Sequence, residues 1–169
     1  MGAKKFVRNS LEKKIQITDE FIGETLSIYK DENIYVNNAS YYSSEIKGDV
    51  EISHYPFTKD EYIQYVTAPM IMLYLSQMGY LLVRCLVEDG IIPISLENFF
   101  KYRNQGKIML CAFDDIKLKS KIYTIKKKFQ LTVSLIYYHE TKTGITGKVY
   151  FETENNEFSG FTTVQIYLS

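Results

Sequence analysis

Tryptophan is absent from this 169-residue chain, and cysteine, histidine and proline are scarce, with two, two and three residues. The two cysteines, Cys85 and Cys111, lack metal-ligand spacing and are too few for a disulfide framework. We therefore expect two reduced thiols in a cytoplasmic protein. A glycine-rich phosphate loop, a Gly-x-Ser-x-Gly elbow and a zinc motif are also missing, so neither a cofactor nor a metal ion is expected.

The charges balance, with 20 Lys and Arg against 20 Asp and Glu. A general nucleic-acid binder normally has a basic excess, so nucleic acid is not an expected partner. The basic N-terminus, MGAKKFVRNSLEKK, is not followed by an apolar segment, which argues against a signal peptide.

The most apolar segment, TAPMIMLYLSQMGYLLVRCLVEDG, predicts one long helix over residues 67–88. Thr67 is the candidate N-cap, Pro69 falls in the first turn, and Gly90 ends the helix. A helix that is apolar nearly all round is buried in protein or in lipid. Ser76, Gln77, Gly79 and Arg84 interrupt the apolar run, and no interfacial anchor flanks it. We therefore expect a core helix and no membrane insertion.

Other segments show shorter patterns. A helix is expected from Thr18 to near Tyr29, and a helical turn begins at the capping box of residues 58–61. Residues 33–54 look extended, with a bend at 47–49. After a short helix at 96–102, alternating sequence predicts five strands at 107–113, 115–125, 129–138, 147–153 and 159–167.

This order of elements predicts a single α+β domain over residues 1–169, with residues 1–17 as a flexible N-terminal segment. A sheet that curls around one apolar helix buries the apolar surface of both. We therefore predict a hotdog fold, a curved antiparallel sheet wrapped around one long central helix.

Thioester chemistry needs a polarised carbonyl and an oriented water or other nucleophile, and neither requires a covalent intermediate. The start of the long helix, at Thr67 and Ala68, offers free backbone N–H groups to a carbonyl oxygen. Tyr62, Thr67, Ser76 and Gln77 are candidates for placing the water. For Ser76 and Gln77, an equal alternative is a structural role as a polar notch in the buried helix, with their side chains hydrogen-bonded to the sheet.

The two histidines differ in context. His54, in SHYPF before the long helix, resembles the catalytic histidine of hotdog dehydratases, although the glycine of that motif and the acidic partner are missing. It is a candidate substrate-binding residue or base. His139 precedes a turn, and a solvated surface position is expected for it.

Five segments carry a resemblance to a known family: LSIYKDENIYVNNASYYS (26–43), DEYI (60–63), LYLSQMGYLLV (73–83), SLENFFKYR (95–103) and VYFETENNEFSG (149–160). The chain resembles the FcoT-type fatty acyl-CoA thioesterases over nearly all of its length after the first twenty residues. This resemblance implies a hotdog homodimer or higher homo-oligomer that binds acyl-CoA or acyl-carrier-protein thioesters. It also implies that relatives in isonitrile biosynthesis add glycine to a 2-enoyl thioester. Tyr29 and Tyr62 match the family's tyrosines, whereas Thr67 and Ser76 replace its asparagines.

Three functions remain open from the sequence. The first is an enzyme that hydrolyses an acyl thioester or adds glycine to a 2-enoyl thioester; the second is a 3-hydroxyacyl thioester dehydratase using His54. The third is a non-catalytic acyl-binding protein. A lysine cluster between Lys117 and Lys128 fits a CoA phosphate, an acidic carrier protein or an ordinary solvated sheet face.

Overall fold

The computed structural model describes residues 4–5, 14–51, 66–119 and 128–168. The helices are α1 (Asp19–Leu26), a 3-10 turn η1 (Asp31–Asn33), α2 (Ala68–Glu88) and α3 (Leu96–Asn104). The strands are β1 (Lys4–Lys5), β2 (Ile15–Ile17), β3 (Val36–Tyr42), β4 (Glu45–Glu51), β5 (Ile108–Leu118), β6 (Lys128–Glu140), β7 (Gly144–Thr153) and β8 (Phe158–Tyr167).

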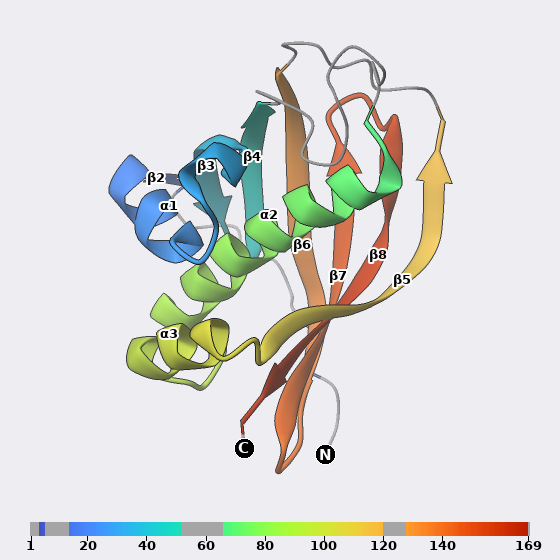
Figure 1. Ribbon diagram of the computed structural model, residues 1–169. Coiled ribbons are helices and arrows are strands. Elements are labelled where there is room, and N and C mark those ends of the chain that lie inside the picture. The colour runs from blue at the N-terminus through green and yellow to red at the C-terminus, as the bar shows by residue number, and fades with distance from the viewer. Residues whose placement is uncertain (1–3, 6–13, 52–65, 120–127, 169) are drawn as a thin grey trace.

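The strands form one antiparallel sheet in the order β2-β3-β4-β6-β7-β8-β5, with β1 added beside β6. The sheet curves around α2, while α1 and α3 lie at the C-terminal half of that helix (Figure 1). Alternating burial along β4 and β7 places one side chain in two against α2. The predicted α+β class and hotdog fold, with a curved antiparallel sheet around one central helix, are confirmed.

The central helix α2 begins one residue after its predicted N-cap, Thr67, and carries Pro69 in its first turn. It ends where Gly90 takes a φ of 69°, a left-handed conformation that favours glycine. By length and composition α2 resembles a membrane span, yet 78% of its apolar window is buried inside the protein. Its apolar surface is therefore accounted for by the protein core.

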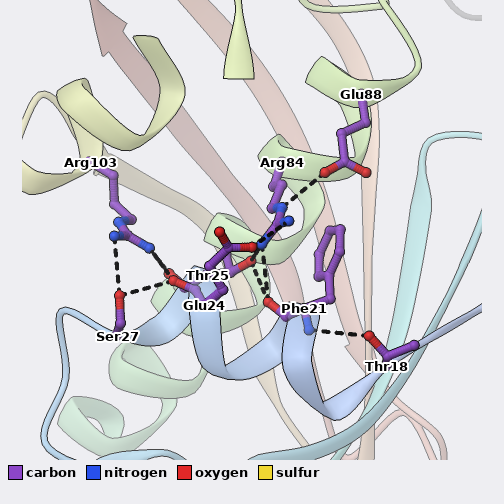
Figure 2. A network of polar contacts seen from close by, with 8 residues as sticks. All are labelled: Thr18, Phe21, Glu24, Thr25, Ser27, Arg84, Glu88 and Arg103. Carbon is purple, nitrogen blue, oxygen red and sulfur yellow. Dashed lines mark hydrogen bonds and ion pairs between the residues drawn. The ribbon is translucent and has the colours of Figure 1, made fainter. Parts of the chain in front are cut away.

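Two buried arginines join the three helices (Figure 2). Arg84 on α2 donates to Thr25 Oγ1 at 2.9 Å and forms ion pairs with Glu24 at 2.8 Å and Glu88 at 3.0 Å. Its guanidinium also lies 3.8 Å from the centre of the Phe21 ring. Because α1 is only eight residues long, contacts with α2 supply the stability that so short a helix lacks alone.

Arg103 on α3 binds the backbone at the C-terminal end of α1. Its Nη1 donates to the carbonyl oxygens of Glu24 and Thr25, both at 2.6 Å, and its Nη2 donates to Ser27 Oγ at 3.2 Å. The last carbonyls of a helix have no partner within that helix. Arg103 therefore satisfies two of them and places a positive charge at the negative end of the helix dipole.

Two local predictions differ from the structure. The turn before β4 is at Ser43 and Ser44, which have φ values of 45° and 68°, while Gly48 lies inside β4 instead of in a bend. Residues 108–118 form one strand, because the irregularity at Asp114 is a bulge in the pairing with β8. Within the segment predicted to be flexible, Lys4–Lys5 and Ile15–Ile17 pair with β6 and β3.

Candidate functional site

A groove lies between the middle of α2 and the start of β5. Ser76 and Tyr80 are four residues apart on α2 and therefore share one face of the helix. The groove, called the Ser76 groove below, has a volume of about 30 Å³. It is lined by Ser76, Gly79, Tyr80, Ile108, Met109, Leu110 and Val164.

The two hydroxyls of the Ser76 groove donate to backbone carbonyls. Ser76 Oγ donates to Met72 O, one turn earlier in α2, at 2.8 Å. Tyr80 Oη donates to Ile108 O at 3.0 Å and so links α2 to the first residue of β5. The serine bond is made within its own helix turn, so rotation about one side-chain torsion redirects this hydroxyl toward a ligand.

Tyr29 joins this group from the chain after α1. Its ring meets that of Tyr80 edge-on, with centroids 6.4 Å apart. Burial, together with the neighbouring Tyr80, raises the pKa of Tyr29 above its usual value. Burial also raises the pKa of Tyr80, and the charge of Arg103 partly opposes this. Both phenols are therefore neutral at physiological pH, when they donate hydrogen bonds and do not act as bases.

An apolar cavity lies directly behind the groove, between α2 and the sheet. This inner cavity has a volume of about 20 Å³ and shares Gly79 and Val164 with the Ser76 groove. It is lined by Gly79, Leu82, Val83, Leu86, Ile92, Leu135, Ile145, Gly147, Val149, Val164 and Ile166. The hydroxyl-bearing groove and the inner cavity, which is lined by apolar residues, thus lie next to each other and share two lining residues.

Gln77 is fully buried, and its amide is engaged by the backbone. Its Oε1 accepts from Tyr35 N at 3.0 Å, and its Nε2 donates to Asn33 O at 2.6 Å. These bonds attach the segment between η1 and β3 to α2. The geometry therefore favours the structural role for Gln77, that of a hydrogen-bonded polar notch. A contact between Gln77 and a substrate would have to replace one of these two bonds.

Thr67 and Ala68 lie at the start of α2, away from Ser76. Thr67 is the N-cap but makes no capping bond through its side chain, and Ala68 is exposed. Nine positions separate Thr67 from Ser76, which is two and a half helical turns and roughly 13 Å of rise. The structure therefore places these two predicted residues on opposite faces of α2 and does not bring them to one carbonyl group.

Two further predicted residues, His54 and Tyr62, lie outside the described residues. His139 is half-buried on β6 opposite Thr146 of β7. Among the described residues no group of three or more His, Cys, Asp or Glu side chains is arranged to hold a metal ion.

A larger hollow, of about 230 Å³, lies at the C-terminal end of α2. Its lining includes Phe21, Tyr41, Cys85, Glu88 and Asp89. Glu88 is paired with Arg84, but Asp89 and the negative end of the helix dipole disfavour an anionic thioester carrier here. The Ser76 groove has no such charges and suits a thioester better.

Cys85 faces this hollow but is not a nucleophile at neutral pH. Burial, together with the nearby Glu88 and Asp89, raises the pKa of its thiol to about 12. In a Cys111→Ser variant, Cys85 is expected to react with a thiol reagent at pH 8 only after unfolding. The absorbance of the released chromophore in native and denatured protein measures this, and fast labelling of the native protein would contradict the assignment.

The structure adds Tyr80 and Gly79 to the residues singled out from the sequence. Tyr80 follows Ser76 by four residues, so the helical spacing alone would have placed its hydroxyl beside that of Ser76. Gly79 carried no such signal, because its position between two hollows depends on the packing of β5 and β8 against α2.

No family model matches the chain, and no curated protein matches it in sequence. The resemblance to the FcoT-type family therefore stays a prediction. Among solved structures, the chain is similar to a homologue of HP0420 from Helicobacter felis, with a TM-score of 0.53 and 14% identity over 90% of this chain and 94% of that one. It is also similar to the dehydratase domain of RzxB from Pseudomonas fluorescens, with a TM-score of 0.51 and 8% identity over 99% of this chain and 53% of that one. At these identities the likeness shows the fold alone.

Proposed function

We propose that this protein is a hotdog enzyme that binds an acyl thioester in the Ser76 groove, as a cytoplasmic relative of the FcoT-type thioesterases. The observation that carries the proposal is that a groove bearing two hydroxyls lies next to a cavity lined by apolar residues, with Gly79 and Val164 in both walls. An acyl thioester has the same division, with a polar carbonyl at one end and a hydrocarbon tail at the other. Binding sites for such ligands are mostly apolar with a few convergent polar groups.

Ser76 is the hydroxyl proposed to contact the thioester. Its Oγ–H turns from Met72 O to the thioester oxygen and stabilises the negative charge that develops there during attack. Tyr80 holds the opposite wall of the groove through its bond to Ile108 O, and Tyr29 packs against the Tyr80 ring. Because these phenols stay protonated, the nucleophile is an oriented water or amine and not a tyrosinate.

Two reactions fit this arrangement. In hydrolysis, water attacks the carbonyl carbon, the C–S bond breaks and the thiol leaves with a proton. In the addition, the amine of glycine attacks the β-carbon of a 2-enoyl thioester, a proton goes to the α-carbon, and the C–S bond remains. Incubation with a 2-enoyl thioester, with and without glycine, distinguishes the two reactions. Hydrolysis releases free thiol, whereas the addition yields a product with the mass of the glycine adduct. If CoA and carrier-protein substrates of several lengths yield neither product, the proposed function is wrong.

The carrier of the acyl group is proposed to be CoA or an acyl carrier protein. Lys117 and Lys119 are exposed at the end of β5, where they suit a phosphate or an acidic surface. Lys121, Lys126 and Lys127 of the predicted cluster lie outside the described residues, and Lys128 forms an ion pair with Glu51 at 3.0 Å.

Tyr80→Phe is expected to lower kcat/KM for thioester turnover about tenfold, mainly through KM. The change removes the hydrogen bond to Ile108 O and loosens the wall of the groove, and a loss of this size is typical of one such bond. Steady-state kinetics on the two proteins measure it. Tyr102→Phe is a matched control, because this half-buried tyrosine bonds Leu168 O at a longer 3.4 Å and is not part of the groove lining. Equal effects of the two changes would contradict a positioning role for Tyr80.

The protein is also proposed to be a homodimer through β5. Among the described strands β5 pairs with β8 alone, and it leaves Met109, Ile116 and Leu118 exposed by 43%, 50% and 62%. A long, apolar strand at the edge of a sheet is a template for pairing with another chain. We propose a second copy of this chain as the partner, because closed two-fold dimers are the commonest oligomers.

Light scattering is expected to give about twice the 19.7 kDa chain mass. Ile116→Lys together with Leu118→Lys is expected to yield monomers, because each copy would bring two ammonium groups into the interface, four in the dimer. Ile136→Lys, at a side chain 37% exposed on β6, is the matched control. A wild-type monomer, or a dimer unaffected by the β5 changes, would contradict this interface.

A second candidate function is dehydration of a 3-hydroxyacyl thioester, which the likeness to the RzxB dehydratase domain favours. It predicts that His54→Ala abolishes activity while Tyr62→Phe has little effect. Binding of acyl thioesters without any turnover would instead favour a non-catalytic acyl-binding protein.

A further inference from the structure

Gly79 is the point at which the Ser76 groove and the inner cavity meet. It lines both hollows, together with Val164 from β8. A Cβ atom added at Gly79 would meet only Leu110 Cδ2, at 3.9 Å. At Gly48, by contrast, an added Cβ would lie 2.7 Å from the sulfur of Met78. The absent side chain at Gly79 therefore leaves space between the two hollows, whereas the absent side chain at Gly48 makes room for Met78.

We propose that the acyl tail passes Gly79 into the inner cavity, and that this residue sets the acyl chain length the protein accepts. The inference rests on the proposed function and adds to it a specificity-determining residue and a class of substrate. Since the cavity beyond Gly79 is lined by apolar side chains such as Leu82, Leu86 and Leu135, it selects an unsubstituted hydrocarbon tail.

The size of the space limits the tail to a short one. The inner cavity measures about 20 Å³ and the groove about 30 Å³. A volume of roughly 10–15 Å³ on this scale holds one water-sized group. The two hollows together therefore hold an acyl chain on the order of four carbons, with its carbonyl carbon in the groove, and longer chains must displace the packed side chains around the cavity.

S-alkyl-CoA thioethers test this passage because they bind without being turned over. Dissociation constants are measured by calorimetry for the methyl, butyl, hexyl and dodecyl compounds. Each methylene that enters an apolar cavity is worth about a fourfold gain in affinity. The wild-type protein is expected to gain affinity from methyl to butyl and to gain no more beyond hexyl.

Gly79→Leu is expected to lose the gain in affinity from the methyl to the butyl compound. Gly79→Ala, which fits at an ordinary contact distance, is expected to keep part of that gain and guards against a failure of the leucine variant to fold. Gly23→Leu places the same side chain on α1, where an added Cβ meets nothing within 4 Å, and is expected to match the wild type.

A dependence on alkyl length that survives in Gly79→Leu would overturn the passage, as would a wild-type protein with no such dependence. Affinity that keeps rising to dodecyl would overturn the length limit. The proposed function is tested separately. If binding depends on alkyl length and on Gly79 but no thioester is turned over, the passage is supported and the proposed reaction is wrong.

Discussion

Arg103→Ala is expected to lower the melting temperature by about 6–12 °C. The change leaves the carbonyls of Glu24 and Thr25 at the end of α1 without their 2.6 Å donors. Removing the partners of two buried acceptors costs on the order of 3 kcal/mol. In a chain of this length each kcal/mol shifts the melting temperature by roughly 2–4 °C.

Two further variants separate the geometry of Arg103 from its charge. Arg103→Lys keeps the positive charge at the end of α1 but lacks the planar fork whose Nη1 reaches both carbonyls while Nη2 reaches Ser27, so an intermediate melting temperature is expected. Lys101→Ala, at an exposed residue of the same helix, is expected to leave it nearly unchanged. Calorimetry measures all three melting temperatures. Equal values for Arg103→Ala and Lys101→Ala would show that the hydrogen bonds of Arg103 do not stabilise the fold.

Ser76→Ala is expected to lower kcat/KM for thioester turnover by about 10²–10³, which is the usual effect of removing one donor to a developing oxyanion. Folding should not suffer, because the hydroxyl bonds only to Met72 O in its own helix and alanine is the better helix former. The loss is expected in kcat more than in KM, since the bond strengthens as charge develops.

Kinetics and melting temperatures are measured together on the Ser76→Ala protein. A fall in kcat with an unchanged melting temperature supports a direct contact with the reacting group. A parallel fall in both quantities would indicate that Ser76 matters for folding only.

The central helix and most of the sheet could be predicted because their sequence signals are local. The 67–88 segment has a cap, a proline and a terminal glycine at the expected places, and β6 and β7 alternate between apolar and polar residues. The turn at Ser43–Ser44 was not predicted, because left-handed serines leave no mark as clear as glycine does. The bend was predicted at Gly48 instead, although the small size of this glycine makes room for the Met78 side chain.

The site was only partly predictable, because its members come together through packing. Ser76 was singled out as a polar residue in an apolar helix, and it does line a groove. Gln77 gave the same signal, yet its amide serves Asn33 and Tyr35. Nothing in the sequence near Arg103 pointed to α1, since its partners lie almost 80 residues earlier in the chain.

The position of the thioester on α2 is the central claim, and Thr67→Val measured beside Ser76→Ala tests it most directly. The two residues lie on opposite faces of the helix, so one carbonyl group cannot depend on both hydroxyls. Release of free thiol from one acyl-CoA substrate is followed for the wild type and the two variants. The account predicts a fall of about 10²-fold or more for Ser76→Ala and a change of less than about twofold for Thr67→Val. A large fall for Thr67→Val with little change for Ser76→Ala would place the reaction at the start of α2 and contradict the account.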